Sequence, residues 1–177
     1  LRGHLDKFSD NLLSGGTNAF TDEPATAINV LGNKGTDTVA NVARIYKAAG
    51  RKWVIVGDAN YGEGSSREHA ALSPRLLGGV AVIAKSFARI HESNLKKQGL
   101  LALTFQNPDA YDSLGAEDRL NLTGLDDLAP GKPVTCTVRR ADGSTDTLRL
   151  NHTFSESQLG WFRSGSAVNL FNQSQAA

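Results

Sequence analysis

Helical and strand-like segments alternate through the middle of this chain. From Thr36 to Ala49 apolar side chains recur at helical spacing, and Gly50 follows as a stop signal. Further helices are predicted over residues 67–77 and 87–98, where Pro74 breaks or kinks the first and Gly99 closes the second. Apolar runs that predict strands are residues 53–57, 80–84 and 100–105. This order predicts a parallel or mixed sheet flanked by helices.

The two ends of the chain carry weaker patterns. Residues 1–24 read as loop with a short strand or turn around Leu12 and Leu13, and residues 25–35 fit no single element. In the last third, alternating apolar and polar positions predict two antiparallel strands joined by a tight turn, followed by a helix that Gly160 and Gly165 weaken. These segments are residues 133–139, 141–144, 145–150 and 155–170. We therefore expect residues 1–177 to form one α/β domain with an additional antiparallel β section.

Composition narrows the classes of function. The chain has 177 residues, of which 40% are hydrophobic and 21% charged, which is typical of a globular domain with a real core. A formal net charge of +1 gives no reason to expect a nucleic-acid partner, and no apolar run is long enough to cross a membrane. The one cysteine, Cys136, excludes a disulfide framework and cannot by itself hold an iron–sulfur cluster or zinc. We expect it to be a strand thiol.

The densest chemistry follows the strand at residues 53–57. A glycine-rich turn, GEGSSR at residues 62–67, delivers Ser65, Ser66 and Arg67 to the start of a helix. Unpaired N–H groups at a helix start attract anions, and a guanidinium suits a carboxylate. The turn matches neither a dinucleotide loop, a phosphate-binding loop nor a nucleophile elbow. The residues alone leave two interpretations open: an anion site, or a helix start capped by a serine.

Other polar residues suggest ordinary structural roles. His4, His91 and His152 are scattered without metal-ligand spacing, and His69 is expected to pack on its own helix. Lys96 and Lys97 read as the solvated basic end of a helix. The sequence contains no methionine and begins at Leu1 without a signal or transit pattern, so we expect it to be part of a longer polypeptide.

A wider comparison of motifs points to one family. The segment YGEGSSREHAAL at residues 61–72 closely resembles the signature of the aconitase C-terminal domain, in the mitochondrial rather than the cytosolic form. Further segments resemble their counterparts in the same order: RGHLD at 2–6, KSFARIHE at 85–92, NLKKQGLL at 94–101, LAPGKP at 128–133 and GSA at 165–167. The resemblance therefore covers nearly the whole chain.

The resemblance implies a fold and a reaction. The family's C-terminal domain is a swivelling β/β/α structure that closes over a cleft, and the other wall of the cleft carries a [4Fe–4S] cluster on further domains. Citrate and isocitrate are interconverted there through cis-aconitate by dehydration and rehydration. By resemblance, Ser65 is the catalytic base, and Ser66, Arg67 and Arg2 bind substrate carboxylates. This chain then holds no metal ligand, is inactive alone, and works in the mitochondrial matrix with a tricarboxylate substrate and the cluster-bearing domains.

The sequence leaves two other functions open. The GSSREH core is shared with the separate small subunit of isopropylmalate isomerase, and Ser73 stands where mitochondrial aconitases commonly have glutamate and homocitrate-handling relatives have serine. The substrate is therefore open among citrate, homocitrate and isopropylmalate. A stand-alone domain that binds a tricarboxylate or a partner without catalysis is the third reading.

Overall fold

A six-stranded mixed sheet forms the centre of the molecule in a computed structural model that describes residues 12–13, 16–31, 35–63 and 68–166. The strand order is β3-β4-β5-β8-β7-β6, with β3, β4 and β5 parallel and the remaining neighbours antiparallel. The strands are β3 Trp53–Gly57, β4 Gly79–Ala84, β5 Leu101–Phe105, β6 Arg119–Thr123, β7 Val134–Arg139 and β8 Thr145–Asn151. The α-helices are α2 Val39–Ala48, α3 Glu68–Leu76, α4 Arg89–Lys97 and α5 Glu156–Ser164; the short 3-10 helices are η1 Pro108–Ser113 and η2 Leu125–Asp127.

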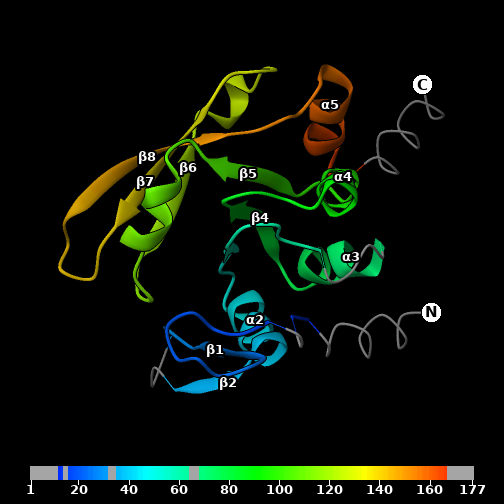
Figure 1. The fold of residues 1–177 in the computed structure, drawn as a ribbon. Coiled ribbons are helices and arrows are strands. Elements are labelled where there is room, and N and C mark those ends of the chain that lie inside the picture. Colours follow the sequence, from blue (N-terminus) through cyan, green and yellow to red (C-terminus); the bar gives the residue numbers. More distant parts are fainter. Residues whose placement is uncertain (1–11, 14–15, 32–34, 64–67, 167–177) are drawn as a thin grey trace.

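The side chains of β4 alternate between two cores, which explains its continuous apolar run. Val82 packs with Ala71 of α3 and Leu95 of α4 on one face. Ala81 and Ile83 pack on the other face with the inward side of β7 and β8. Figure 1 shows the same layering, with α3 and α4 on one side of β4 and the three antiparallel strands β6, β7 and β8, the antiparallel leaf, on the other. The predicted α/β class with flanking helices, a mixed sheet and an antiparallel section is confirmed.

The two halves of the sheet are joined by a short ladder. Strand β5 pairs with β8 at only two positions, Thr104 with Asn151 and Phe105 with Leu150. By contrast, β7 and β8 pair over six consecutive positions. One more backbone bond, from the Gln106 N–H to the Arg149 carbonyl at 3.1 Å, extends this junction, and an apolar core with residues of β4, β5, β7 and β8 also joins the two halves.

The N-terminal part differs from the sequence-based expectation. Strands β1 Thr26–Ile28 and β2 Thr36–Thr38 form an antiparallel pair, so the helix predicted from residue 36 begins only at Val39. Its start is fixed by Thr38, whose hydroxyl accepts a hydrogen bond from the Asn41 N–H at 3.2 Å. A capping threonine is as compatible with a strand end as with a helix start, which is why the pattern placed the boundary too early.

Of two other predicted helix ends, the one near residue 77 is confirmed and the one at residue 170 is corrected. Pro74 neither breaks nor ends α3, which continues to Leu76. Helix α5 is shorter than the predicted 155–170, because Gly165 takes a left-handed conformation with φ of 91° and ends the helix after Ser164. Residues 167–170 lie outside the described part of the chain. A capping box between Ser155 and Gln158 starts α5.

Lys96 is buried, which corrects its prediction as a solvated helix end. Only 4% of the residue is exposed, and its Nζ donates to Thr153 Oγ1 at 2.7 Å and Gln158 Oε1 at 3.2 Å. Glu92 Oε1 lies 3.8 Å away, and the ammonium group lies 5.0 Å from the centre of the Phe154 ring. Burial lowers the pKa of the Lys96 ammonium, an effect that the Glu92 carboxylate opposes. Lys96 therefore connects α4 to the start of α5.

Removing this connection has a testable cost. We expect Lys96→Ala to lower the free energy of unfolding by about 3 kcal/mol, because it removes two hydrogen bonds and leaves Glu92 facing a void. Lys96→Met keeps the chain of methylene groups, and we expect a loss of only about 1 kcal/mol. Urea unfolding followed by circular dichroism measures both, with exposed Lys97→Ala as the control. Equal losses for Lys96→Ala and Lys97→Ala would contradict the connecting role.

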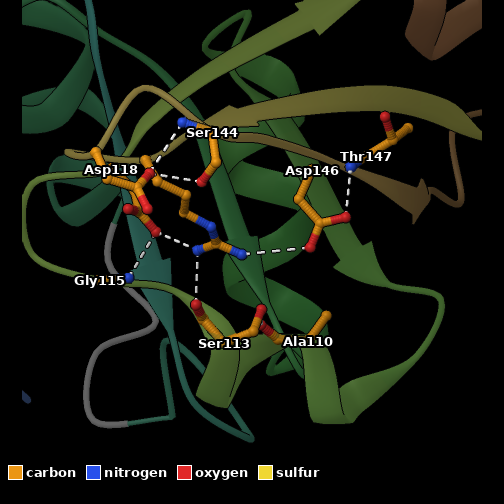
Figure 2. A network of polar contacts seen from close by, with 9 residues as sticks. Ala110, Ser113, Gly115, Asp118, Ser144, Asp146 and Thr147 are labelled. Atoms are coloured by element: carbon orange, nitrogen blue, oxygen red, sulfur yellow. Dashed lines mark hydrogen bonds and ion pairs between the residues drawn. The ribbon is translucent and has the colours of Figure 1, made fainter.

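A charged network holds the tip of the antiparallel leaf. Arg140 contacts the carboxylates of Asp118 and Asp146 and donates to the backbone carbonyl of Ser113 at 2.6 Å (Figure 2). Asp118 also accepts from the Gly115 N–H at 2.7 Å. The loop before β6 is thus tied to the β7–β8 turn through one guanidinium.

Among the helices that the structure describes, none is long and apolar enough to span a membrane.

Candidate functional site

The site begins where the parallel strands end. Because β3, β4 and β5 are parallel, their carboxyl ends lie at one edge of the sheet, where ligands bind in open α/β sheets. The segment after β3 leads into the turn singled out in the sequence, and its Tyr61 pairs with Phe87 after β4. Tyr111 after β5 lies against Lys85 after β4, so the three connections contact one another in sequence order at this edge.

An ion pair joins the first two connections. Lys85 Nζ, after β4, lies 3.1 Å from Asp58 Oδ1, after β3, and 4.5 Å from the ring centre of Tyr111 in η1. The Ala59 N–H and then Lys85 lower the pKa of the Asp58 carboxyl, and the hydrogen bond to Asp58 raises the pKa of Lys85. The Asp58 side chain is 65% exposed, so this ion pair contributes only modestly to holding the two strand ends together.

Backbone contacts continue this attachment up to the turn. The Asn60 N–H donates to Ser86 Oγ at 2.8 Å, and the Tyr61 N–H donates to the Ser86 carbonyl at 3.0 Å. The Ala88 N–H returns a bond to the Tyr61 carbonyl at 2.9 Å. Tyr61 and Phe87 thus form an isolated parallel bridge, with their rings edge to face at a centroid distance of 6.0 Å. The chain entering the turn is therefore fixed at two consecutive residues.

Two glycines let the Tyr61 segment pack closely. A Cβ on Gly57 would lie 2.5 Å from the Tyr61 ring, so only glycine leaves room for that ring at the end of β3. Gly62 has φ of 91°, and a Cβ there would lie 2.3–2.4 Å from Cβ, Cγ and Cδ2 of His91. Burial raises the pKa of the Tyr61 hydroxyl, so the ring is neutral. The chain up to Gly62 is consequently close-packed against the first turn of α4.

The structure does not describe the predicted site residues themselves. Arg2, Ser65, Ser66 and Arg67 fall outside the residues that the structure describes. Their predicted roles therefore stay predictions. Helix α3, which they precede in the chain, is described from Glu68 onward.

Sequence reasoning missed the supporting residues of this edge. The sequence gives His91 no role beyond that of one of several scattered histidines, yet only 4% of the residue is exposed. Its ring packs against Gly62 and against the Tyr61 ring, with a distance of 5.5 Å between the two ring centres. Lys85 was noted only within a matching segment. Only their place in the family-like segment at 85–92 pointed to these two residues. Contacts between the segment after β3 and the segment after β4 cannot be deduced from the spacing of residues along the chain.

A cavity of about 470 Å³ lies at the other side of the sheet from β3, beside the start of β6 and the β7–β8 turn. Its lining includes Arg119, Arg139 and Arg140, and Glu117 lies beside them. Arg140 is already neutralised by Asp118 and Asp146. Among the described residues that line this cavity, none belongs to the turn after β3.

The described residues do not fit an iron–sulfur cluster or another metal. Cys136 is fully buried in β7, and burial raises the pKa of its thiol. No cluster of three or more histidine, cysteine or acidic side chains suited to a metal ion occurs within the described ranges. The sequence contains no second cysteine. A cluster held by several cysteines would therefore need ligands from outside this chain.

Comparisons with known proteins agree with the resemblance in the sequence. The model of the aconitase C-terminal domain matches residues 1–108. Mitochondrial aconitate hydratase of Gracilaria gracilis is 60% identical over 169 residues, covering 95% of this chain and 21% of that protein. The mitochondrial enzyme of Saccharomyces cerevisiae is 52% identical over 168 residues, covering 95% and 22%. The chain thus spans about a fifth of the length of these relatives.

One solved structure shows the fold again. The 3-isopropylmalate dehydratase LeuD of Methanocaldococcus jannaschii aligns with a TM-score of 0.50 and 24% sequence identity, over 70% of this chain and 65% of that one. This likeness shows a shared fold alone. With more than half of the chain matched by the family model, and with relatives above 50% identity along nearly its whole length, the chain belongs to the aconitase C-terminal domain family.

Proposed function

We propose that this chain is the swivel domain of an aconitate hydratase, a hydro-lyase that interconverts citrate and isocitrate in the mitochondrial matrix. The observation that carries the proposal is the 51–60% identity to mitochondrial aconitate hydratases over at least 95% of the chain. The 24% identity to the isopropylmalate enzyme supports a common fold and adds nothing about substrate. The whole chain, residues 1–177, acts in this proposal as one domain of a larger assembly.

The proposed division of labour follows from what the chain contains. Ser65 removes a proton from the substrate carbon, and Arg67 and Arg2 bind its carboxylates with help from Ser66. A serine hydroxyl has a very high pKa, so its alkoxide needs N–H donors and a neighbouring cation. Two guanidinium groups that bind a tricarboxylate from different sides fix the reacting carbon beside Ser65. The [4Fe–4S] cluster belongs to the other domains, because this chain has no ligand set for it.

The close packing before the turn supports this assignment physically. Asp58, Asn60 and Tyr61 are each bonded to the β4 connection, so the backbone that leads to Ser65 departs from a fixed point. A base that acts on one carbon of a bound substrate requires such a fixed origin, since a displacement of about 1 Å costs roughly a hundredfold in rate.

A domain exchange tests the proposal. We expect a chimera in which this chain replaces the corresponding fifth of the Gracilaria gracilis enzyme to convert citrate to cis-aconitate within about tenfold of the parent kcat. Formation of cis-aconitate is followed by its ultraviolet absorbance after the cluster has been reconstituted. Homocitrate and isopropylmalate are tested with the same chimera, and a preference for either would replace citrate as the substrate.

Two controls separate the alternatives. The isolated chain is expected to show no turnover, and calorimetric titration with citrate measures whether it binds the anion alone. Tight binding by the isolated chain that Arg67→Ala abolishes, together with an inactive but folded chimera, would favour a tricarboxylate-binding domain without catalysis.

A further inference from the structure

His91 is a buried polar residue for which the proposed chemistry has no use. It lies in the first turn of α4, is 4% exposed, and its Nδ1 is buried without a hydrogen-bond partner in the described part of the molecule. Buried polar atoms are nearly always paired, because leaving one unpaired costs free energy. An orphaned nitrogen next to the candidate site therefore needs a physical explanation.

The packing around the ring supplies one. The edge of the imidazole that carries Cγ and Cδ2 faces Gly62, where a Cβ would come within 2.4 Å of both atoms. The Tyr61 ring lies against the same imidazole at 5.5 Å, tilted by 57°. Because Cδ2 and Nδ1 lie on opposite sides of Cγ, Nδ1 points away from the turn. The ring thus presents carbon atoms to Gly62 and leaves its orphaned nitrogen on the far edge.

The protonation state follows from this arrangement. An orphaned buried N–H is more costly than an orphaned lone pair, so Nδ1 is the unprotonated nitrogen and Nε2 carries the proton. Burial also lowers the pKa of His91, which keeps the imidazole neutral near pH 7. Tyr61, the titratable group packed on the ring, is itself neutral. His91 is thus an uncharged, flat spacer.

We propose that His91 is a positioning residue, whose neutral imidazole sets the path of the Tyr61–Glu63 turn, from which the chain continues to the proposed base Ser65. The catalytic part of this inference rests on the proposed function. The steric part does not, since it depends only on Gly62 and the ring. The two parts call for separate measurements.

A double-mutant cycle on the 177-residue chain tests the steric part. Gly62→Ala is expected to lower Tm by about 8 °C, because its Cβ meets the ring and φ is 91°. Gly143→Ala is the matched control, since Gly143 has φ of 86° and open space around it; we expect a loss of about 3 °C. In the His91→Ala background the extra loss at Gly62 should shrink to that of the control. Additive losses would overturn the proposal.

Nuclear magnetic resonance of the imidazole nitrogens measures which of them is protonated, a property that the packing of the ring does not by itself determine. We expect a protonated Nε2 and an unprotonated Nδ1 for His91 near pH 7. Protonation of both nitrogens near pH 7 would mean a charged imidazolium, which contradicts the assigned role as a neutral spacer.

Kinetics of the active chimera test the catalytic part. His91→Ala is expected to reduce kcat by about tenfold with KM changed by less than about threefold, because a shifted base affects the transition state more than carboxylate binding. His91→Phe keeps a ring beneath Gly62 and should restore kcat to within about threefold of the parent. Unchanged kcat in folded His91→Ala, or no recovery in His91→Phe, would refute positioning. If the unmodified chimera is inactive, the proposed function fails and the Tm cycle still decides the steric role.

Discussion

Replacing Ser65 by alanine is expected to lower kcat of the active chimera by about 10³-fold or more, with KM changed by less than about threefold. The reason is that the hydroxyl is proposed to remove the substrate proton, whereas the arginines are proposed to bind the carboxylates. Loss of a proton-transfer group acts on the transition state and leaves ground-state binding nearly intact. Steady-state kinetics with citrate and with isocitrate measures both constants.

Ser66→Ala is the neighbouring comparison for this prediction. Ser66 is proposed to bind a carboxylate, so its removal should raise KM more than it lowers kcat. Exchange of the substrate proton with deuterated solvent reports the abstraction step directly and should disappear in Ser65→Ala. Turnover close to normal in Ser65→Ala would remove serine as the base, while an equal loss in both variants would point to a common effect on the helix start.

Gly99→Ala is expected to destabilise the domain by at least about 3 kcal/mol. Gly99 follows α4 with φ of 78°, and a Cβ there would lie 1.9 Å from the carbonyl oxygen and 2.5 Å from the carbonyl carbon of Gly165. Both contacts are with backbone that ends α5, so neither can be relieved by turning a side chain. Helices α4 and α5 would have to separate, which also strains the buried Lys96 contacts.

Gly50 offers a closely matched control for that substitution. It follows α2 in the same way, with φ of 70°, but a Cβ there would meet nothing within 4 Å. Gly50→Ala therefore reports the cost of the left-handed backbone alone, about 1 kcal/mol. Chemical denaturation of the two variants gives the difference in free energy of unfolding. A difference smaller than about 1 kcal/mol would mean that α5 moves away from α4 at little cost.

The sequence predicted the parts of the fold that depend on local pattern. The run at residues 80–84 indicated a strand buried on both faces, and β4 does pack against two cores. The alternation over 133–139 correctly placed β7, with Cys136 turned inward. The short β1–β2 pair was missed, because three residues carry too little periodicity to distinguish a strand from a helix start.

Long-range contacts explain the remaining differences. Lys96 stands in a lysine pair at a helix end, and only the return of the chain at Thr153 and Gln158 makes burial of its ammonium group feasible. His91 and Gly62 meet although they are far apart in sequence, so no local spacing could connect them. The roles of Arg2, Ser65, Ser66 and Arg67 came from the family resemblance, since the residues alone left a capped helix start equally open.

The two-position ladder between β5 and β8 also has a consequence for how the chain acquires its structure. Strands β6, β7 and β8 are consecutive in sequence and antiparallel, so they can assemble from near neighbours with little loss of loop entropy. The parallel strands need helical crossovers and form more slowly. Because few backbone pairs cross the junction, we expect the antiparallel strands to join the parallel half mainly through the apolar core that the two share.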